Sequence, residues 1–491
     1  MREDTLHGVL ERHAKLRGDR LAIITETSRW TYGALNEKAN QLGRYLRDRG
    51  VQPGDRVAVL CRNDEWFALA FFALLKIGAV VVPTNVRLTA HELEQLFTRH
   101  HVTGVIYHES LADGLPNCDL RHSYGVYDAC EKALSFPGTD LSVARSPKEP
   151  CELLFTSGTT GRPKGALFNH ERILNTARAI AAEFRVTEKD VWLHLMPLTH
   201  AAPLNTFFMS GLVAGTGHVI GDFSPDTFLR WIERERTTLT FAAPVAYLLA
   251  ARQLADAAYR LDSMRLYAYG GGPLPAASYE QVRDAFQSQA FYQVYGLTES
   301  GPNGIFLRPE EHATKAGSIG KTPVRNMKLR VVTADGADAA TGEYGEILLA
   351  GNSLMLGYDN DPAETNHVLR DGWLYTGDIA YRDEDGYVYI VDRKKDVIIT
   401  GGVNVYPREV EEALARHPAV MESCVVGVPH PVWGETVKAC VVLRTQVTEA
   451  ELRQHVRAYL ADFKCPRIYE FLSELPRNAN GKVLKQRLKA L

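Results

Sequence analysis

A surplus of charge of one sign is absent from this sequence, and that absence excludes one class of partner. The chain has 491 residues and a formal net charge of only −3, from 56 basic and 59 acidic side chains. No segment concentrates the basic side chains. Since nucleic acid binding depends on a basic face that meets the phosphates, we expect no nucleic acid partner.

Long apolar runs and paired cysteines are also missing. The longest apolar stretch, residues 66–83, is interrupted by Lys76 and Gly78, so we expect no membrane span. Residues 1–20 are charged and contain no apolar signal core. The seven cysteines are scattered without a CxxC pair, which argues against a zinc or disulfide framework and predicts reduced thiols in a cytoplasmic protein.

What the sequence does have is an alternation of short apolar runs and amphipathic segments. At 491 residues and 45% apolar content, the chain is too long for one hydrophobic core. Spacing of apolar residues predicts helices and strands in turn, over residues 66–76, 79–83, 92–100 and 103–107. Strands that alternate with helices predict an α/β fold with sheets of parallel type flanked by helices.

The pattern changes twice toward the C-terminus. From about residue 328, short strands joined by turns predict a β-rich subdomain. Beyond the charged run VDRKKDV, elements alternate again, over residues 407–416, 424–428, 437–443 and 449–463. We therefore expect a large N-terminal domain, residues 1–394, and a small α+β domain, residues 395–491.

The stretch TSGTTGRPKG, residues 156–165, suits neither a helix nor a strand. It follows a short apolar strand and contains four hydroxyl side chains, three glycines and Lys164. Glycines let backbone N–H groups approach an anion, and hydroxyl and lysine groups can meet its oxygens. The order does not match the GxxxxGK[ST] pattern of P-loop NTPases. Taken alone, the stretch fits a phosphate loop and a mobile surface turn equally well.

Five blocks in chain order decide between these two interpretations. They are TSGTTGRPKG at 156–165, YGLTE at 295–299, YTGD at 375–378 with the following Asp392–Arg393 pair, KDVIITGG and NVYP within 395–407, and NANGK at 478–482. Together they resemble the motifs of the adenylate-forming superfamily, which contains acyl- and aryl-CoA ligases, luciferases and peptide-synthetase adenylation domains. The resemblance extends over almost the whole chain.

The resemblance implies an AMP-forming acid–thiol ligase. A carboxylic acid and ATP would give an acyl-adenylate and pyrophosphate, and the thiol of coenzyme A would then displace AMP. ATP, Mg²⁺ and coenzyme A are the implied cofactors and co-substrates. Two alternatives stay open: an adenylating enzyme that loads a carrier protein, and a luciferase-like oxygenase.

The resemblance also implies roles in adenylation. Glu299 matches the family's Mg²⁺ residue, and a carboxylate suits that hard cation. Lys482 matches a lysine that bridges the carboxylate and the α-phosphate, a task for a compact charge on a long stem. Thr298 would donate to the phosphates, and Asp378, beside Arg393, would accept from the ribose hydroxyls. The other residues expected around ATP are Thr156, Ser157, Gly158, Thr159, Thr160, Lys164, Gly270, Gly271, Gly272, Gln293, Tyr295 and Gly296.

A second orientation of the C-terminal domain is implied for thioester formation. In the family this domain rotates about a hinge, which corresponds to Lys395. Gly401 and Gly402 would then line the pantetheine tunnel, where a thiol arm passes close to the backbone.

The acid is expected to have an apolar tail. His200 matches a gating position, and the predicted wall comprises His200, Ala201, Val245, Gly271, Val294, Pro302 and Asn303. No carboxylate stands where amino-acid adenylation domains pair the substrate's ammonium, and an ammonium buried without one would be costly. A medium- or long-chain fatty acid and an aryl acid fit equally well.

Overall fold

The structure, a computed structural model, describes residues 4–141, 146–156, 163–272, 274–401, 403–477 and 483–491. Two compact units make up the chain: unit 1, Met1–Leu329 with Leu349–Tyr375, and unit 2, Arg330–Leu348 with Thr376–Leu491. The chain changes unit within three strands, β15 (Met327–Val332), β16 (Gly345–Gly351) and β19 (Trp373–Arg382). The domain boundary predicted at Lys395 refers to a hinge between domains that move, whereas the two units are defined by packing, and it stays a prediction.

Seven strands of unit 1 form one mixed sheet, in the order β17-β8-β7-β4-β3-β5-β6. Their bounds are Gly357–Tyr358, Lys164–Asn169, Pro150–Thr156, Val80–Pro83, Arg56–Leu60, Gly104–Tyr107 and His122–Gly125. The central strand β3 runs parallel to β4 and β5, whereas β8 is antiparallel to β7 and β17. Val57 and Val59 enter one hydrophobic core, and Ala58 and Leu60 enter another. Both faces are therefore covered, which explains the unbroken apolar run of β3.

A second sheet of unit 1 has eight strands, in the order β14-β13-β12-β11-β9-β10-β1-β2. Their bounds are Ile305–Leu307, Phe291–Tyr295, Leu266–Gly270, Leu239–Ala242, Val191–His194, Gly217–Ile220, Leu21–Ile24 and Arg29–Thr31. The inner pairs are parallel, and the two edge pairs, β13–β14 and β1–β2, are antiparallel. The expected α/β fold is confirmed, with antiparallel strands added at the edges.

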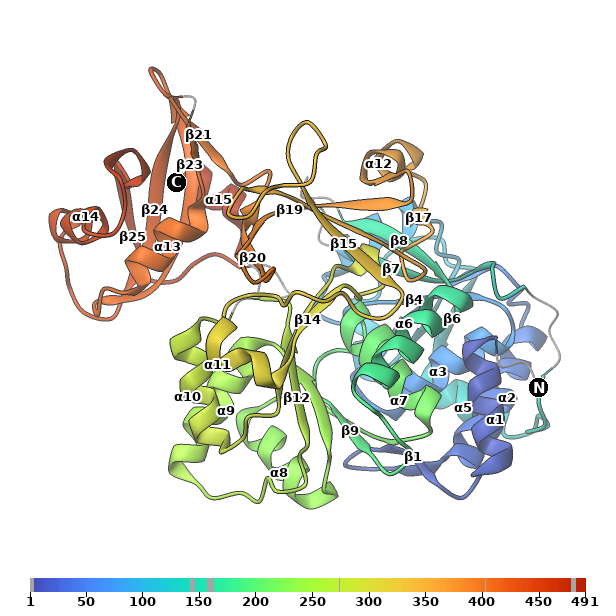
Figure 1. Cartoon of the computed structure of the whole chain (residues 1–491). Helices are drawn as coiled ribbons and strands as arrows, with labels where there is room; N and C mark the ends of the chain where they lie inside the picture. The colour runs from blue at the N-terminus through green and yellow to red at the C-terminus, as the bar shows by residue number, and fades with distance from the viewer. Residues whose placement is uncertain (1–3, 142–145, 157–162, 273, 402, 478–482) are drawn as a thin grey trace. The chain divides into compact units, whose positions relative to one another are not determined.

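Helices fill the space between the two sheets and cover their outer faces (Figure 1). The core between the sheets receives Ile23 from the eight-stranded sheet, Val59 from the seven-stranded sheet, and the apolar residues of α3. Helices α8, α9 and α10 cover the other face of the eight-stranded sheet. The main helices of unit 1 are α1 (Leu6–Leu16), α2 (Tyr32–Asp48), α3 (Glu65–Lys76), α4 (Ala90–Arg99), α5 (Val126–Ala133), α6 (His170–Glu183), α7 (Met209–Ala214), α8 (Pro225–Glu235), α9 (Pro244–Asp256), α10 (Ala276–Phe286), α11 (His312–Lys315) and α12 (Pro362–Val368).

Unit 2 contains most of the predicted β-rich subdomain and the small α+β domain. The first sheet joins β15, β16 and β19, and β20 (Val388–Arg393) pairs with β19. β18 (Leu369–Arg370) pairs with the first two residues of β19 inside unit 1. The second sheet has the order β22-β21-β24-β23, with β25 parallel to β24. Its strands span Val403–Val405, Ile398–Thr400, Gly434–Leu443, Val420–His430 and Ile468–Leu472, and its helices are α13 (Pro407–Ala415), α14 (Glu449–Arg457) and α15 (Lys485–Ala490). Val425 packs toward α13 and Val426 toward α15, so helices cover both faces.

The predicted helices differ from the structure at their ends, and two of these differences have local causes. Helix α3 begins at Glu65, because the Asp64 carboxylate accepts hydrogen bonds from the backbone N–H groups of Trp66 and Phe67. The helix predicted over residues 449–463 is wrong at its end, since α14 stops at Arg457. Beyond it the chain turns so that Leu460 and Cys465 pack into the same core as α14.

Two expectations about the whole chain can be compared with the described residues. All seven cysteines are unbridged. Among the described helices, none combines the length and the apolar content that crossing a bilayer requires.

A buried carboxyl group lies in the core of unit 1. Glu152, on β7, is fully buried, and Asn205 Nδ2 donates a hydrogen bond of 2.5 Å to its Oε2. Asn205 belongs to a π-helical segment, η2 (Ala202–Phe208), which the sequence did not predict. Burial raises the pKa of Glu152 from an ordinary value of 4.5 to about 8, despite the amide donor. The side chain is therefore a neutral acid at neutral pH.

This shift predicts a pH-dependent effect of Glu152→Gln on stability. Between pH 4.5 and 8 the unfolded chain releases the Glu152 proton and the folded chain keeps it, so wild-type stability falls as pH rises. The glutamine cannot ionise. From pH 5 to pH 8 the variant should therefore gain roughly 2–4 kcal/mol relative to wild type, at about 1.4 kcal/mol per pKa unit. Urea unfolding of both proteins at the two pH values measures the difference, and a pH-independent difference would contradict the shift.

Candidate active site

The predicted phosphate loop connects β7 to β8 in unit 1. Thr156 ends β7 and Lys164 begins β8, and the two residues are register partners across the antiparallel pair. The hairpin therefore holds both ends of the loop side by side. The loop residues Ser157, Gly158, Thr159 and Thr160 lie outside the described residues.

The Lys164 ammonium has two neighbours from a distant part of the sequence. Its Nζ lies 2.5 Å from Glu364 Oε1, on α12, and 5.0 Å from the centroid of the Tyr358 ring. The Lys164 side chain is only 11% exposed. A lysine so far withdrawn from water depends on such partners.

Glu299 contacts the hydroxyl group of Tyr358. With Thr298, it belongs to a 3₁₀ turn, η3 (Thr298–Ser300), shortly after β13. The Tyr358 hydroxyl donates a 2.7 Å hydrogen bond to Glu299 Oε1, and the Met355 N–H donates to the Glu299 carbonyl. Tyr358 therefore contacts both the predicted phosphate lysine and the predicted metal carboxylate.

The single carboxylate of Glu299 suits an Mg²⁺ ion that is bound together with a nucleotide. Among the described residues, no group of three or more His, Cys, Asp or Glu side chains could enclose a metal ion. Mg²⁺ is commonly bound through one or two carboxylates plus the phosphates of a substrate. A single partly exposed carboxylate such as Glu299 suits that mode.

Asp359, next to Tyr358, fixes this segment to the seven-stranded sheet. Its carboxylate accepts two hydrogen bonds from Arg56, of 2.8 and 2.7 Å, and lies 2.8 Å from His100 Nδ1. Its backbone N–H donates to the carbonyl of Gly165, which directly follows Lys164. Burial alone would raise the pKa of Asp359, but the hydrogen bonds and charges of His100 and Arg56 hold it below its usual range.

The predicted adenine strip lies at the ends of β12 and β13. Gly270 is the register partner of Val294, and a Cβ at Gly270 would lie 2.5 Å from the Val294 carbonyl oxygen. Gly271 has φ +77°, which favours glycine, but a Cβ at Gly271 or Gly272 would meet nothing within 4 Å. The open space beside these two glycines is what a flat ring requires, whereas Gly270 is constrained by the neighbouring strand.

The remaining predicted nucleotide residues lie on β13 or directly after it. Gln293 is buried and accepts a 3.3 Å hydrogen bond from the Tyr269 hydroxyl. Tyr295 ends the strand, and a Cβ at Gly296 would lie 2.9 Å from the Asn303 backbone nitrogen. The tight turn therefore brings the YGLTE block against a residue of the predicted acid wall.

Four of the predicted acid-wall residues differ in exposure. Ala201 and Asn303 are buried, His200 is partly buried, and the Val245 side chain is 60% exposed at the start of α9. Burial, together with the nearby charge of Arg87, lowers the pKa of His200. Next to this wall, η2 is tied to Pro302, whose carbonyl accepts from the Thr206 hydroxyl at 3.0 Å.

Predicted site residues also occur in unit 2. Asp378 on β19 is the register partner of Arg393 on β20, and Arg393 Nε lies 2.6 Å from Asp378 Oδ1. Lys395 belongs to the turn that follows β20. Gly401 has φ +58°, and a Cβ there would lie 2.9 Å from the Trp433 ring. Gly402 and Lys482 lie outside the described residues.

Sequence reasoning missed Tyr358, Asp359 and Glu364. The only available signal was a cluster of acidic residues after Gly357, in the stretch GYDNDPAET. Glu364 lies 200 positions beyond Lys164. Nothing in the local pattern therefore connects the two.

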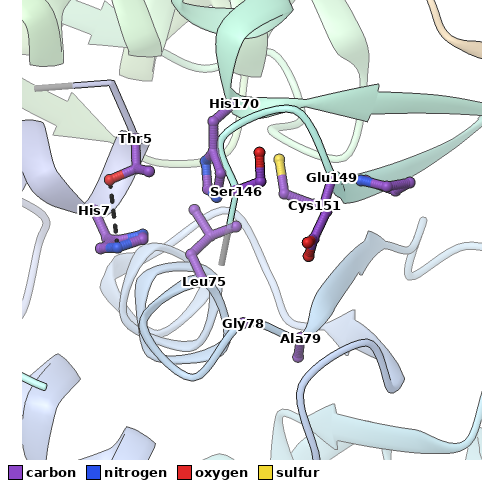
Figure 2. A pocket seen from close by; sticks show the side chains of 10 residues that line it. Thr5, His7, Leu75, Gly78, Ala79, Ser146, Glu149, Cys151 and His170 are labelled. Carbon is purple, nitrogen blue, oxygen red and sulfur yellow. Dashed lines mark hydrogen bonds between the residues drawn. The ribbon is translucent and has the colours of Figure 1, made fainter. Parts of the chain in front are cut away.

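A small cavity elsewhere in unit 1 contains none of the predicted site residues. It is lined by Thr5, His7, Cys151 and His170, among others, and has room for about one water molecule (Figure 2). It is too small for a nucleotide or an organic acid.

Comparison with known proteins identifies the family. The model of the AMP-binding enzyme family matches residues 10–359, and that of the AMP-binding enzyme C-terminal domain matches residues 409–482. A feruloyl-CoA synthase from Amycolatopsis sp. is 36% identical over 99% of this chain and 98% of its own length. A long-chain-fatty-acid–CoA ligase from Bacillus subtilis is 33% identical over 99% of this chain and 94% of its own.

Solved structures of CoA ligases have the same fold as this chain. The structure of o-succinylbenzoate CoA synthetase from Bacillus subtilis, in complex with its acyl-adenylate intermediate, superposes with a TM-score of 0.89. It is 29% identical and the match covers 98% of this chain and 97% of the other. The predicted superfamily, fold class and enzyme class are confirmed: the chain belongs to the AMP-binding enzyme family, among the adenylate-forming acyl- and aryl-CoA synthetases.

Proposed function

We propose that the chain joins an apolar aryl acid to coenzyme A through an acyl-adenylate, with Lys164, Glu299, Asp378 and Lys482 as its main polar groups. The observation that carries the proposal is that Lys164 and Glu299 both contact Tyr358, Lys164 at the ring and Glu299 at the hydroxyl. A positive charge and a metal-binding carboxylate kept close together suit the triphosphate of ATP.

In the adenylation step the carboxylate of the acid must approach a negatively charged α-phosphate. Lys164 and the hydroxyls of Thr156 and Thr298 would bind phosphate oxygens, and Lys482 would meet the developing charge between the two reactants. Mg²⁺ bound at Glu299 would supply further neutralisation of the phosphate oxygens. Asp378 would accept from the ribose hydroxyls, and Arg393 would hold its carboxylate in place.

For the thioester step we propose the domain rotation implied by the family, about Lys395. Gly401 would then lie along the path of the pantetheine arm. Its positive φ and its closeness to Trp433 support a position where side chains are excluded. Free coenzyme A is the proposed acceptor, as it is for the CoA ligases to which the chain is similar.

The aryl acid is proposed from the relatives and from the wall. The feruloyl-CoA synthase and the o-succinylbenzoate CoA synthetase both take aryl acids, as their names state. Val294, packed against Gly270, is a branched residue in the predicted wall and narrows it. A compact planar tail fits such a wall better than a long flexible chain.

We also propose a cytoplasmic location. The seven unbridged cysteines support it, because reduced thiols persist in that compartment. ATP and coenzyme A would be available there.

The proposal predicts the outcome of an acid panel. With free coenzyme A, ferulate and benzoate-type acids should give AMP and the thioester at a kcat/KM at least about 10-fold above octanoate and palmitate, the scale of a 1.4 kcal/mol difference. Pyrophosphate release and thioester formation are measured for each acid. Turnover only with a carrier protein would point to the loading alternative, and preference for palmitate would contradict the aryl proposal.

Asp378→Ala should weaken nucleotide binding and remove the preference for ATP over 2′-deoxy-ATP. Loss of the acceptor should raise the KM for ATP by about 10- to 100-fold, the scale of hydrogen bonds to a charged group. Wild type should discriminate against 2′-deoxy-ATP, and the variant should not. Equal discrimination in both proteins would show that Asp378 does not contact the ribose.

Lys482→Ala should separate the two half-reactions. Loss of one electrostatic stabiliser should slow adenylation by at least about 100-fold. Thioester formation from supplied acyl-adenylate and coenzyme A should stay near the wild-type rate. Equal losses in both half-reactions would mean that Lys482 acts structurally.

A further inference from the structure

Tyr358 is the residue at which two separate parts of the ATP site meet. It ends β17, a strand of two residues that pairs with β8. Its hydroxyl donates to Glu299 Oε1 at 2.7 Å, and its ring carries the Lys164 ammonium 5.0 Å from the centroid. The side chain is only 8% exposed.

The backbone around Tyr358 is fixed on every side. The Tyr358 N–H donates to the Thr365 hydroxyl on α12, and the Leu356 N–H donates to the Leu167 carbonyl on β8. The Met355 N–H donates to the Glu299 carbonyl, and Asp359 is held by Arg56 and His100. In Figure 1, β8, β17 and α12 lie next to one another. The backbone that carries the ring is therefore held by both neighbouring elements, and Tyr358 itself is buried.

We propose that Tyr358 is a positioning residue for Mg²⁺ and ATP, which sets Glu299 and Lys164 at a fixed separation. The hydroxyl occupies Glu299 Oε1 and so leaves Oε2 as the oxygen presented to the metal. The ring face keeps the Lys164 ammonium beside the site, where Glu364 neutralises it until phosphate replaces that carboxylate. The inference rests on the proposed roles of Glu299 and Lys164.

The two contacts have different chemical requirements, so two substitutions separate them. Tyr358→Phe removes the hydroxyl and keeps the ring, and therefore frees the Glu299 carboxylate alone. Tyr358→Leu removes both the hydroxyl and the ring face that Lys164 uses. Tyr32→Phe is a matched control, because the Tyr32 hydroxyl also donates a 2.7 Å hydrogen bond in a buried part of unit 1, to the Thr216 carbonyl.

Binding is measured by calorimetry with a non-hydrolysable ATP analogue over a range of Mg²⁺ concentrations. For Tyr358→Phe, the Mg²⁺ concentration that gives half-maximal binding should rise at least about 10-fold, the scale of one hydrogen bond to a charged group. Affinity for AMP without Mg²⁺ should not change, since AMP lacks the β- and γ-phosphates. In Tyr358→Leu, affinity for the analogue at saturating Mg²⁺ should fall by a further factor of about 3 or more, the scale of a cation–π contact.

Glu299→Gln distinguishes a failure of this inference from a failure of the proposed function. It should itself raise the Mg²⁺ requirement, and adding Tyr358→Phe to it should have no further effect. If Glu299→Gln raises the requirement and Tyr358→Phe behaves like Tyr32→Phe, the inference is wrong and the role of Glu299 stands. If Glu299→Gln leaves the requirement unchanged, the metal role of Glu299 is wrong, and the inference is wrong with it. Equal analogue affinity in Tyr358→Leu and Tyr358→Phe would overturn the contribution of the ring.

Discussion

The charge of Lys164 is held in place by partners from a distant part of the chain. The Lys164 side chain is 11% exposed, so its loss of water is offset by the Glu364 carboxylate and the face of Tyr358. Both partners belong to the segment that runs from β17 to α12, far along the chain from Lys164. That segment is held in turn by Asp359, through Arg56, His100 and the carbonyl of Gly165. The placement of Lys164, at the end of the proposed phosphate loop, thus depends on residues that belong to no recognised loop motif.

The same segment explains how Glu299, the proposed metal ligand, is held in place. Glu299 lies on a short 3₁₀ turn, and such a turn alone gives a side chain considerable freedom. Hydrogen bonds to its backbone carbonyl and to one of its carboxylate oxygens remove much of that freedom. A carboxylate held in this way suits its proposed role, because preorganised groups lower the cost of arranging charge around a reacting phosphate.

Features with local causes could be predicted from the sequence. The apolar run of β3 reflects burial on both faces, and the helix predicted over residues 407–416 is found as α13, Pro407–Ala415. Features that depend on tertiary contacts could not be predicted from the sequence. Nothing near Glu364 in the sequence points to Lys164, and no local pattern indicates that η2 is π-helical or that its buried Asn205 donates to Glu152. At the adenine strip, three adjacent glycines have different causes, and only the structure separates the strand contact of Gly270 from the positive φ of Gly271.

The position of β17 also has a consequence for how the chain is made. β8 is complete at residue 169, but the strand that covers its outer edge does not follow until residues 357 and 358. During synthesis, a chain that has emerged only as far as residue 356 presents the edge of β8 with unpaired backbone groups, which are open to pairing with other chains. Lys164 at the start of β8 also lacks Glu364 at that stage. A fragment that ends shortly before residue 357 should therefore aggregate more readily than a fragment that ends after α12. The two fragments differ by little more than β17 and α12.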